Sequence, residues 1–355
     1  MVISRRHAVI VATSLTLAAA GCSAVLGLRD DYQLVGSEAG VDGNVQDAAS
    51  GDAVTDSSSD GSAGDVGLPV LTTLATNQVT PLGIAVDDTA VYWTNSGGGE
   101  VRKVALDGGT PDTLATGQKG AAGIAVDATG VYWVTQSDAG TVATCNLDGG
   151  GTKLLASAQG QPRSIALDGN NVYWTTYSGG TVEQCTKAGS SLPSLATGEK
   201  SPAGIAVQGA TAYWADLKGQ TVAKCLVAGC ANTPIPIVTG LNSPYGLATD
   251  ATSAYFTDLA GTVLKCPLTG CGNSPTSIAT GQSMPHGIAI DGTNVYWTND
   301  IAGGSIMKCP LSGGCGNNPT VLATGLASPY SIAVDATSVY WTNFGDGTVM
   351  KLTPK

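Results

Sequence analysis

The chain has 355 residues, of which 27 are acidic and 16 are basic, so its formal net charge is −11 at pH 7. Only 12% of the residues are charged and 49 are glycine, so glutamate and lysine are too few to build amphipathic helices. This composition excludes a helix-rich protein and favours an all-β fold with many turns. The negative charge argues against nucleic acid as a partner, because phosphates are bound by basic surfaces.

The N-terminus has the layout of a bacterial lipoprotein signal peptide. Two arginines at positions 5–6 precede an apolar run over residues 8–20, which is too short to span a bilayer. The run leads into Ala-Ala-Gly-Cys, which ends at Cys22 and resembles a lipobox, in which the cysteine is lipidated and becomes the mature N-terminus. We therefore expect a signal peptide over residues 1–22 and a lipid anchor at Cys22. Ser23 is compatible with delivery to the outer membrane. The alternative is an ordinary secretory signal with an incidental cysteine.

Residues 23–67 are predicted to be a disordered linker. They are rich in serine, glycine, alanine and aspartate and contain nine acidic residues and one arginine. Such a segment cannot bury enough apolar surface to offset the entropy of ordering it. The spaced aspartates could suggest calcium, but no EF-hand spacing with its closing glutamate occurs, so a soluble spacer is the better interpretation.

From residue 68 onward the sequence repeats with a period of 40 to 44 residues. The repeated phrase is Gly/Ser-Ile-Ala-Val-Asp or a close variant, and it begins at Gly83, Gly123, Ser164, Gly204, Gly246, Gly287 and Ser331. A tyrosine followed by a second aromatic residue comes after each phrase, and all six tryptophans of the chain stand in this second place. A fixed period near 41 with β-type composition indicates a propeller or a solenoid.

Each repeat contains four short apolar segments separated by turns rich in aspartate and glycine. In the first repeat these predicted strands cover residues 84–86, 91–94, 101–106 and 113–115. They are apolar on both faces, as expected for a sheet that lies between two neighbouring sheets. Four strands per repeat is the pattern of a propeller blade.

The strand count predicts how the ring closes. The seventh repeat supplies three strands before Lys355, and a spare strand over residues 70–75 precedes the first repeat. We therefore expect a seven-bladed β-propeller over residues 68–355, in which the N-terminal strand completes the last blade and leaves no open edge. We expect this domain to be a monomer.

The repeat motifs Gly-Ile-Ala-Val-Asp, Tyr-Trp-Thr-Asn, Gly-Thr-Val-x-Lys and Leu-Asp-Gly-Gly resemble the YWTD repeats of low-density-lipoprotein-receptor-type propellers. The resemblance covers residues 68–355. Aspartate closes the Tyr-aromatic motif only at Asp216 and Asp258, and that family usually has six blades rather than seven. The resemblance implies a propeller with a binding role and identifies no ligand.

Cysteines occupy one place in the third strand of five repeats, at Cys145, Cys185, Cys225, Cys266 and Cys309. In three repeats a second cysteine follows the next turn, which predicts the disulfides Cys225–Cys230, Cys266–Cys271 and Cys309–Cys315. Each would contribute about 2 kcal/mol by loop entropy. A zinc site would need two pairs to face each other, and these pairs lie on separate blades. The two cysteines without a local partner are expected to be buried free thiols, because equivalent places on adjacent blades lie roughly 15 Å apart.

The sequence offers no evident catalytic machinery. The mature chain has one histidine, His286, and no catalytic triad, phosphate-binding loop or histidine-rich metal motif. We therefore predict no catalytic residue, cofactor or metal. Propeller lyases that act on cyclic antibiotics are the nearest enzymatic analogue, and their sites use histidine with glutamate and a metal. Two functions remain: a binding or scaffold module for an unidentified small molecule, glycan or protein, or a lyase or lactonase acting on a small exported substrate.

One rim of the ring differs from blade to blade and is the candidate binding face. The residue before each repeated phrase should lie beside the central channel, and three consecutive repeats place Tyr245, His286 and Tyr330 there. Aromatic rings with a few convergent polar groups are typical of small-ligand sites. The predicted ligand-binding residues are Arg163, Tyr177, Asp216, Tyr245, Asp258, His286, Asp300, Tyr330 and Phe344. The strictest form of the prediction is one concave pocket in which Tyr245, His286 and Tyr330 expose their polar tips. The alternative is a rim whose residues vary because nothing constrains them.

Overall fold

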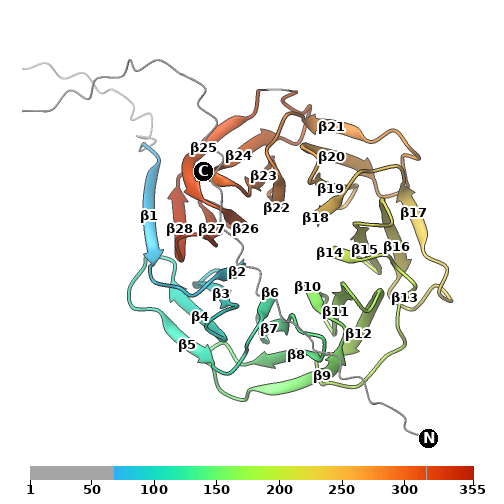
Figure 1. Ribbon diagram of the computed structural model, residues 1–355, viewed down its shortest axis with the longest axis horizontal. Helices are drawn as coiled ribbons and strands as arrows, with labels where there is room; N and C mark the ends of the chain where they lie inside the picture. Colours follow the sequence, from blue (N-terminus) through green and yellow to red (C-terminus); the bar gives the residue numbers. More distant parts are fainter. Residues whose placement is uncertain (1–67, 317) are drawn as a thin grey trace, which may run out of the picture. The chain divides into compact units, whose positions relative to one another are not determined.

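Each repeat folds as one antiparallel sheet of four strands, and seven such sheets stand around a central axis in the computed structural model (Figure 1). The structure describes residues 68–316 and 318–355. The predicted signal peptide, the lipidation site at Cys22 and the linker over 23–67 lie outside the described residues. The seven-bladed, four-stranded, all-β prediction is confirmed. No helix among the described residues is long and apolar enough to cross a membrane.

The four strands of each blade follow one another from the axis outward. The innermost strands are β2 (Pro81–Val86), β6 (Ala121–Asp127), β10 (Pro162–Leu167), β14 (Pro202–Gln208), β18 (Pro244–Thr249), β22 (Pro285–Ile290) and β26 (Pro329–Val334). The second strands are β3 (Ala90–Asn95), β7 (Gly130–Thr135), β11 (Asn171–Thr176), β15 (Thr211–Asp216), β19 (Ser253–Asp258), β23 (Asn294–Asn299) and β27 (Val339–Asn343). The third strands are β4 (Glu100–Ala105), β8 (Gly140–Cys145), β12 (Thr181–Thr186), β16 (Thr221–Leu226), β20 (Thr262–Pro267), β24 (Ala302–Pro310) and β28 (Thr348–Thr353). The outer strands are β5 (Asp112–Ala115), β9 (Lys153–Gln159), β13 (Ala196–Thr197), β17 (Ile235–Val238), β21 (Thr276–Ala279), β25 (Thr320–Ala327) and β1 (Val70–Ala75).

The first strand of the domain closes the ring by pairing with the last. β1 lies antiparallel to β28, with Leu71 opposite Leu352 and Thr73 opposite Met350 (Figure 1). Leu74 and Ala75 of β1 are buried in a cluster with Trp93 of the first blade. The predicted closure is therefore confirmed, and it joins blade seven to blade one through side chains as well as through the backbone.

The aromatic places of the repeats form the core between blades. The tryptophans of the second strands are buried, and five of them donate their indole N–H to a glutamine or glutamate that stands at the end of the preceding blade. In blade five, Phe256 replaces tryptophan and Leu241 replaces the acceptor, so neither a donor nor an acceptor is left unpaired. Blade seven keeps Trp341 opposite Leu326, and the Trp341 indole N–H is buried without a partner.

A fully buried threonine in the second strand links most blades to the next one. In blade five, Thr257 accepts a hydrogen bond from the Gly246 N–H at 2.9 Å and donates to the His286 carbonyl of blade six at 2.8 Å. The same pair of bonds is made by Thr94, Thr175, Thr298 and Thr342. Val134 and Ala215 stand at this place in the other two blades. These threonines fix the spacing of the inner strands around the axis.

The cysteine predictions are confirmed. The structure contains the Cys225–Cys230, Cys266–Cys271 and Cys309–Cys315 disulfides, and Cys145 and Cys185 are buried free thiols. Each disulfide joins a third strand to the residue after the following turn. Burial raises the pKa of both free thiols to about 11.

This burial predicts the reactivity of the two free thiols. At pH 8 the native protein should react with iodoacetamide at Cys145 and Cys185 on the order of a hundredfold more slowly than the urea-unfolded protein, because little thiolate forms and each side chain is only 2% exposed. Peptide mass spectrometry measures the labelling. Fast labelling of the native protein, or a Cys145–Cys185 linkage, would contradict the blade register described above.

Candidate functional site

The second residue of every inner strand lies in a β-bulge beside the central channel. In each inner strand the pairing register shifts across this residue and the next, for example between Pro162 and Ile165 of β10. Bulges redirect side chains and occur often beside functional sites. Six of the seven second residues line a cavity of about 160 Å³: Ala122, Arg163, Ala203, Tyr245, His286 and Tyr330. The seventh, Leu82, packs among apolar side chains that include Ala122 and Tyr330.

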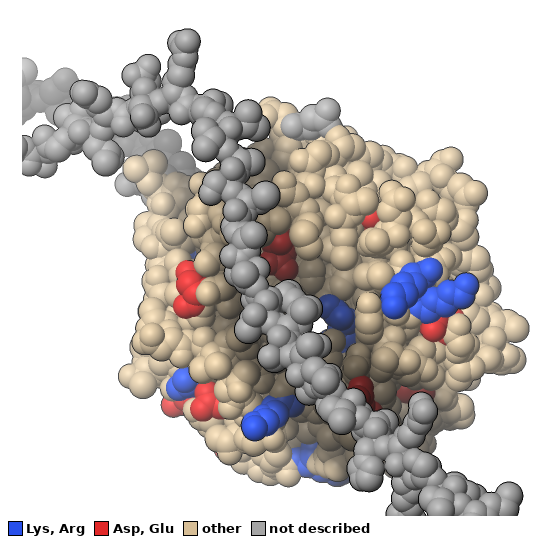
Figure 2. Space-filling model, in the orientation of Figure 1, with Lys and Arg blue, Asp and Glu red and all other residues tan. Residues whose placement is uncertain are grey.

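The third residue of each inner strand also lines this cavity, and it must be small. A Cβ atom on Gly83, Gly204 or Gly246 would come within 2.2 to 2.4 Å of the carbonyl oxygen of the next inner strand. The inner strands converge on the axis too closely for a larger side chain at most of these places. This crowding explains why the repeated phrase begins with glycine or serine. Figure 2 shows the opening at the centre of the ring, with basic atoms at its edge.

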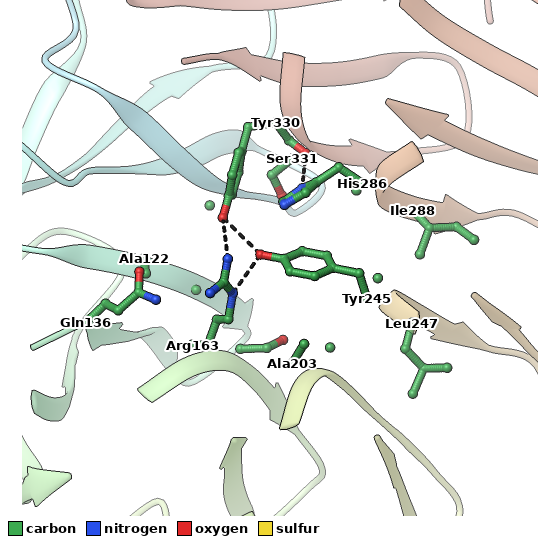
Figure 3. Close-up of a pocket in the computed structure, with 16 residues that line it drawn as sticks. Ala122, Gln136, Arg163, Ala203, Tyr245, Leu247, His286, Ile288, Tyr330 and Ser331 are labelled. Carbon is green, nitrogen blue, oxygen red and sulfur yellow. Dashed lines mark hydrogen bonds between the residues drawn. The ribbon is translucent and has the colours of Figure 1, made fainter. Parts of the chain in front are cut away.

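Arg163 reaches across the cavity and joins three blades. Its Nε donates to the Tyr245 hydroxyl at 2.6 Å, and its Nη2 donates to the Tyr330 hydroxyl at 3.3 Å (Figure 3). The two hydroxyl oxygens lie 3.1 Å apart. Blades three, five and seven therefore meet at one polar cluster. Sequence reasoning placed these residues near the same axis and expected exposed polar tips, whereas both phenol hydroxyls are bound to the guanidinium.

His286 lies between the two tyrosine rings. Its ring centroid is 4.0 Å from that of Tyr245 and 4.0 Å from that of Tyr330, and the rings are tilted by 40° and 46°. Burial lowers the pKa of His286 most, a hydrogen bond to the Tyr330 carbonyl raises it and the nearby Arg163 charge lowers it, and together they bring it to about 3. The imidazole is therefore neutral at pH 7. Its Nδ1 lies 3.1 Å from the Tyr330 carbonyl oxygen, so Nδ1 carries the proton and Nε2 the lone pair.

The loops between second and third strands contribute a second ring of residues at this end of the channel. In each blade the backbone N–H of one loop residue donates to the carbonyl oxygen of the residue just before the inner strand. The seven donors are Ser96, Gln136, Tyr177, Leu217, Leu259, Asp300 and Phe344. The Tyr177 ring lies 4.9 Å from the Arg163 guanidinium carbon, and the Phe344 ring lies 6.4 Å from the Tyr330 ring. Burial raises the pKa of Asp300. Gln136 lines the cavity, although the sequence analysis did not predict it. It could have been found because it occupies the same place in its blade as Tyr177 and Phe344.

Asp216 and Asp258 stand apart from the cavity. They are the last residues of β15 and β19, one place before the second ring, and they are 4% and 2% exposed. Asp216 accepts hydrogen bonds from the backbone N–H groups of Lys200 and Gly219 at 2.8 and 3.1 Å. Asp258 accepts hydrogen bonds from the backbone N–H groups of Asn242 and Ser243 at 2.9 and 3.0 Å. Both carboxylates bind the backbone just before the inner strand of their own blade, and neither lines the cavity.

The donor set of the cavity does not fit a metal ion. No aspartate, glutamate or cysteine lines it, and His286 is its one histidine. Over residues 68–316 and 318–355, no three His, Cys, Asp or Glu side chains are grouped so that they could hold a metal. The Arg163 charge would also repel a cation. A site that combines histidine, glutamate and a metal, as in the lyases considered above, does not fit these residues.

A second cavity, of about 460 Å³, lies between blades two and three at the opposite rim. In four blades a third-strand lysine fills the matching gap and donates to a carbonyl in the next blade, as Lys103 does to Leu147 at 2.8 Å. Thr144 stands at this place in blade two. Lys187 of blade three enters from the other side and pairs with Asp127. The cavity is thus the space that Thr144 leaves where other blades have a lysine. The two lysines that line it already have partners, since Lys153 donates to the Ala188 carbonyl and Lys187 pairs with Asp127.

The comparisons with known proteins agree with this fold. The model of the Virginiamycin B lyase family matches residues 110–355. A comparison with curated proteins found no match. Solved structures of virginiamycin B lyase from Staphylococcus aureus and of a streptogramin B lyase superpose with TM-scores of 0.67 and 0.68 at 16% and 15% sequence identity. They cover 81% of this chain, which in turn covers 99% and 98% of them.

A catalytically inactive variant of the Staphylococcus aureus enzyme, solved with quinupristin, superposes with a TM-score of 0.67 at 18% identity over 81% of this chain and 99% of its own. At these identities the superpositions establish the fold alone. The predicted β-propeller is confirmed, whereas YWTD-type repeats and lipidation stay predictions. Because the family model covers more than half of the chain, the protein belongs to the virginiamycin B lyase family.

Proposed function

We propose that the protein is a monomeric lipoprotein of the bacterial cell envelope whose propeller binds a small molecule at the mouth of its central channel. The observation that carries the proposal is the convergence of Arg163, Tyr245, His286 and Tyr330 on one cavity from four different blades (Figure 3). Concave sites with aromatic walls and a few fixed polar groups are what small ligands use. The cavity is small for a ligand site, so it would hold one compact group of the ligand rather than a whole oligosaccharide or peptide.

A fragment screen by thermal shift tests the binding proposal. Ligands of the mouth should raise the melting temperature of the wild-type protein but not of the triple variant Tyr245→Ala, His286→Ala, Tyr330→Ala. The matched control is Leu71→Ala, Leu154→Ala, Val321→Ala, which removes three exposed side chains of outer strands and should keep the shift. A ligand whose effect survives in the first variant would bind elsewhere and contradict the proposed site.

The second candidate function is a lyase, and family membership favours it. His286 is neutral and holds a lone pair on Nε2, which is the form of a general base. Its lowered pKa makes it a weak base, and no carboxylate of the cavity assists it. For this reason we rank binding ahead of catalysis.

Incubation with quinupristin distinguishes the two functions, because that compound accompanies the inactive variant of the Staphylococcus aureus enzyme. Under the binding proposal its chromatographic peak stays unchanged with wild type and with His286→Ala. Consumption by wild type that His286→Ala abolishes would establish the lyase instead.

The anchoring part of the proposal is tested at Cys22. Cys22→Ala should release the protein from the membrane fraction into the soluble fraction, because stable anchoring depends on the acyl chains that this cysteine would carry. Immunoblotting of the two fractions measures it, and Cys145→Ala is the control that should stay with membranes. Membrane association of the Cys22→Ala protein would refute lipidation at this residue.

A further inference from the structure

We propose that the group recognised at the channel mouth is a carboxylate, held by Arg163 while an attached aromatic or aliphatic group packs beside Tyr245 and Tyr330. This inference rests on the proposed binding function and specifies the chemistry of its ligand. It assigns Arg163 as the residue that selects anionic over neutral ligands.

Among the residues that the structure describes, Arg163 has no counter-charge and does not use all of its hydrogen-bonding capacity. The guanidinium has five N–H donors, and the two side-chain hydrogen bonds described above go to neutral phenols. The ion pairs found within residues 68–316 and 318–355 join Arg102 to Glu100, Lys187 to Asp127 and Lys355 to Asp291, all at other places. A partly buried cation without an anion is costly, and a bound carboxylate would compensate it.

The neighbours of Arg163 stay uncharged over the physiological pH range. Burial raises the pKa of Tyr245 well above 10, so its hydroxyl remains protonated. His286 is neutral, as described above. No acidic side chain lines the cavity. The lining of the cavity therefore presents one fixed positive charge, which does not titrate between pH 5 and pH 9. Two other ionisable groups lie at this rim outside the lining: Asp300 of the second ring, and Lys218, whose Nζ lies 5.8 Å from the centroid of the Tyr177 ring.

The shape of the cavity favours a compact carboxylate over a larger anion. A volume of about 160 Å³ admits one small group, and a planar guanidinium matches a carboxylate with two parallel hydrogen bonds. Leu247 and Ile288 line the cavity beside the tyrosine and histidine rings, so part of the wall is apolar. A carboxylate joined to a ring or a short aliphatic chain satisfies both parts of the wall.

The competing explanation is that Arg163 only ties blades three, five and seven together. If Arg163 were only structural, its two hydrogen bonds to Tyr245 and Tyr330 would be sufficient, and the site would show no preference for a charged ligand. The two explanations therefore differ in what they predict for a pair of ligands that share one shape and differ in charge.

The experiment compares benzoate with benzamide, its neutral analogue, by isothermal titration calorimetry on the full chain. We expect wild type and Arg102→Met to bind benzoate at least tenfold more tightly than benzamide. Arg163→Met should lose this preference while still binding benzamide. Arg102 is the matched control because it is the other arginine of residues 68–355 and lies on β4, away from the cavity. The benzoate preference should be constant from pH 5 to pH 9.

A second variant keeps the test decisive if Arg163→Met fails to fold. Tyr245→Phe with Tyr330→Phe removes both phenol hydroxyls but keeps the charge, so the preference for benzoate should persist. Loss of the preference in this variant, or a preference that disappears as pH rises through 6.5, would overturn the role of Arg163. Equal binding of both probes at the mouth would overturn the carboxylate proposal and leave the proposed function standing. If neither probe binds and no fragment of the thermal-shift screen binds at the mouth, both fail.

Discussion

Deletion of residues 68–78 should lower the melting temperature of the protein by roughly 10 °C or more. The deletion removes β1, exposes the edge of β28 and uncovers the space filled by Leu74, which is 5% exposed. Loss of a buried leucine alone costs about 2–5 kcal/mol. Gln78 is lost as well, and its side-chain oxygen accepts hydrogen bonds from the Trp93 indole and the Asn95 amide. Each buried donor left unpaired adds about 1–3 kcal/mol, and each kcal/mol lowers the melting temperature by about 2 °C in a domain of this size.

Differential scanning calorimetry measures this effect, and two leucines of the same strand provide the controls. Leu74→Ala should reproduce a large part of the loss. Leu71→Ala should change the free energy of unfolding by no more than about 0.5 kcal/mol, because Leu71 is 51% exposed. An unchanged melting temperature after the deletion would mean that the ring does not depend on β1 for closure.

Thr257→Val should lower the free energy of unfolding by roughly 2–4 kcal/mol although the two side chains are similar in volume. The valine cannot accept from the Gly246 N–H or donate to the His286 carbonyl, so two buried backbone groups lose this partner at about 1–3 kcal/mol each. Denaturant unfolding followed by tryptophan fluorescence measures the change. We also expect weaker ligand binding at the mouth, because the backbone of His286 loses its tie to blade five.

The reciprocal substitution at the same place in blade two is the matched control. Val134 there packs in one cluster with Ile165 and Trp174 of blade three, and Val134→Thr would supply a hydroxyl between Gly123 and Arg163. This variant should be neutral or more stable than wild type by up to about 1 kcal/mol. A similar loss of stability in both variants would attribute the effect to side-chain shape and would argue against the blade-to-blade hydrogen bonds.

The repeats made most of the fold predictable, because every blade is an independent copy of the same pattern. Seven aligned phrases were enough to number the blades, to assign the spare strand to blade seven and to separate the paired cysteines from Cys145 and Cys185. The resemblance to YWTD repeats implied a propeller and the strand count predicted its seven blades, whereas the family itself emerged only from the comparison with family models.

The candidate site was predictable in its positions but not in its contacts. The inner-strand column correctly brought Tyr245, His286 and Tyr330 together, because equivalent places in a ring face one axis. The hydrogen bonds of Arg163 depend on the channel width and on the direction of a long side chain, which no repeat encodes. Asp216 ends its second strand, and Tyr177 stands one place later in blade three. This single step decides whether a side chain binds the nearby backbone, as Asp216 does, or turns toward Arg163, as Tyr177 does.

The pairing of β1 with β28 also has a consequence for the order of folding. β1 is the first strand of the domain to be synthesised, and its partner is the last, so Leu71 and Leu352 meet only when nearly the whole domain has left the ribosome. Contacts between residues so far apart in sequence form slowly. Until they form, the unpaired edge of β28 leaves the chain prone to aggregation. Blades one to six can each form all four strands from local hairpins, whereas blade seven obtains its fourth strand only from the distant β1. The rate-limiting step of folding should therefore be the docking of β1, and a circular permutant that begins at β2 and carries β1 after β28 should fold faster than the natural chain.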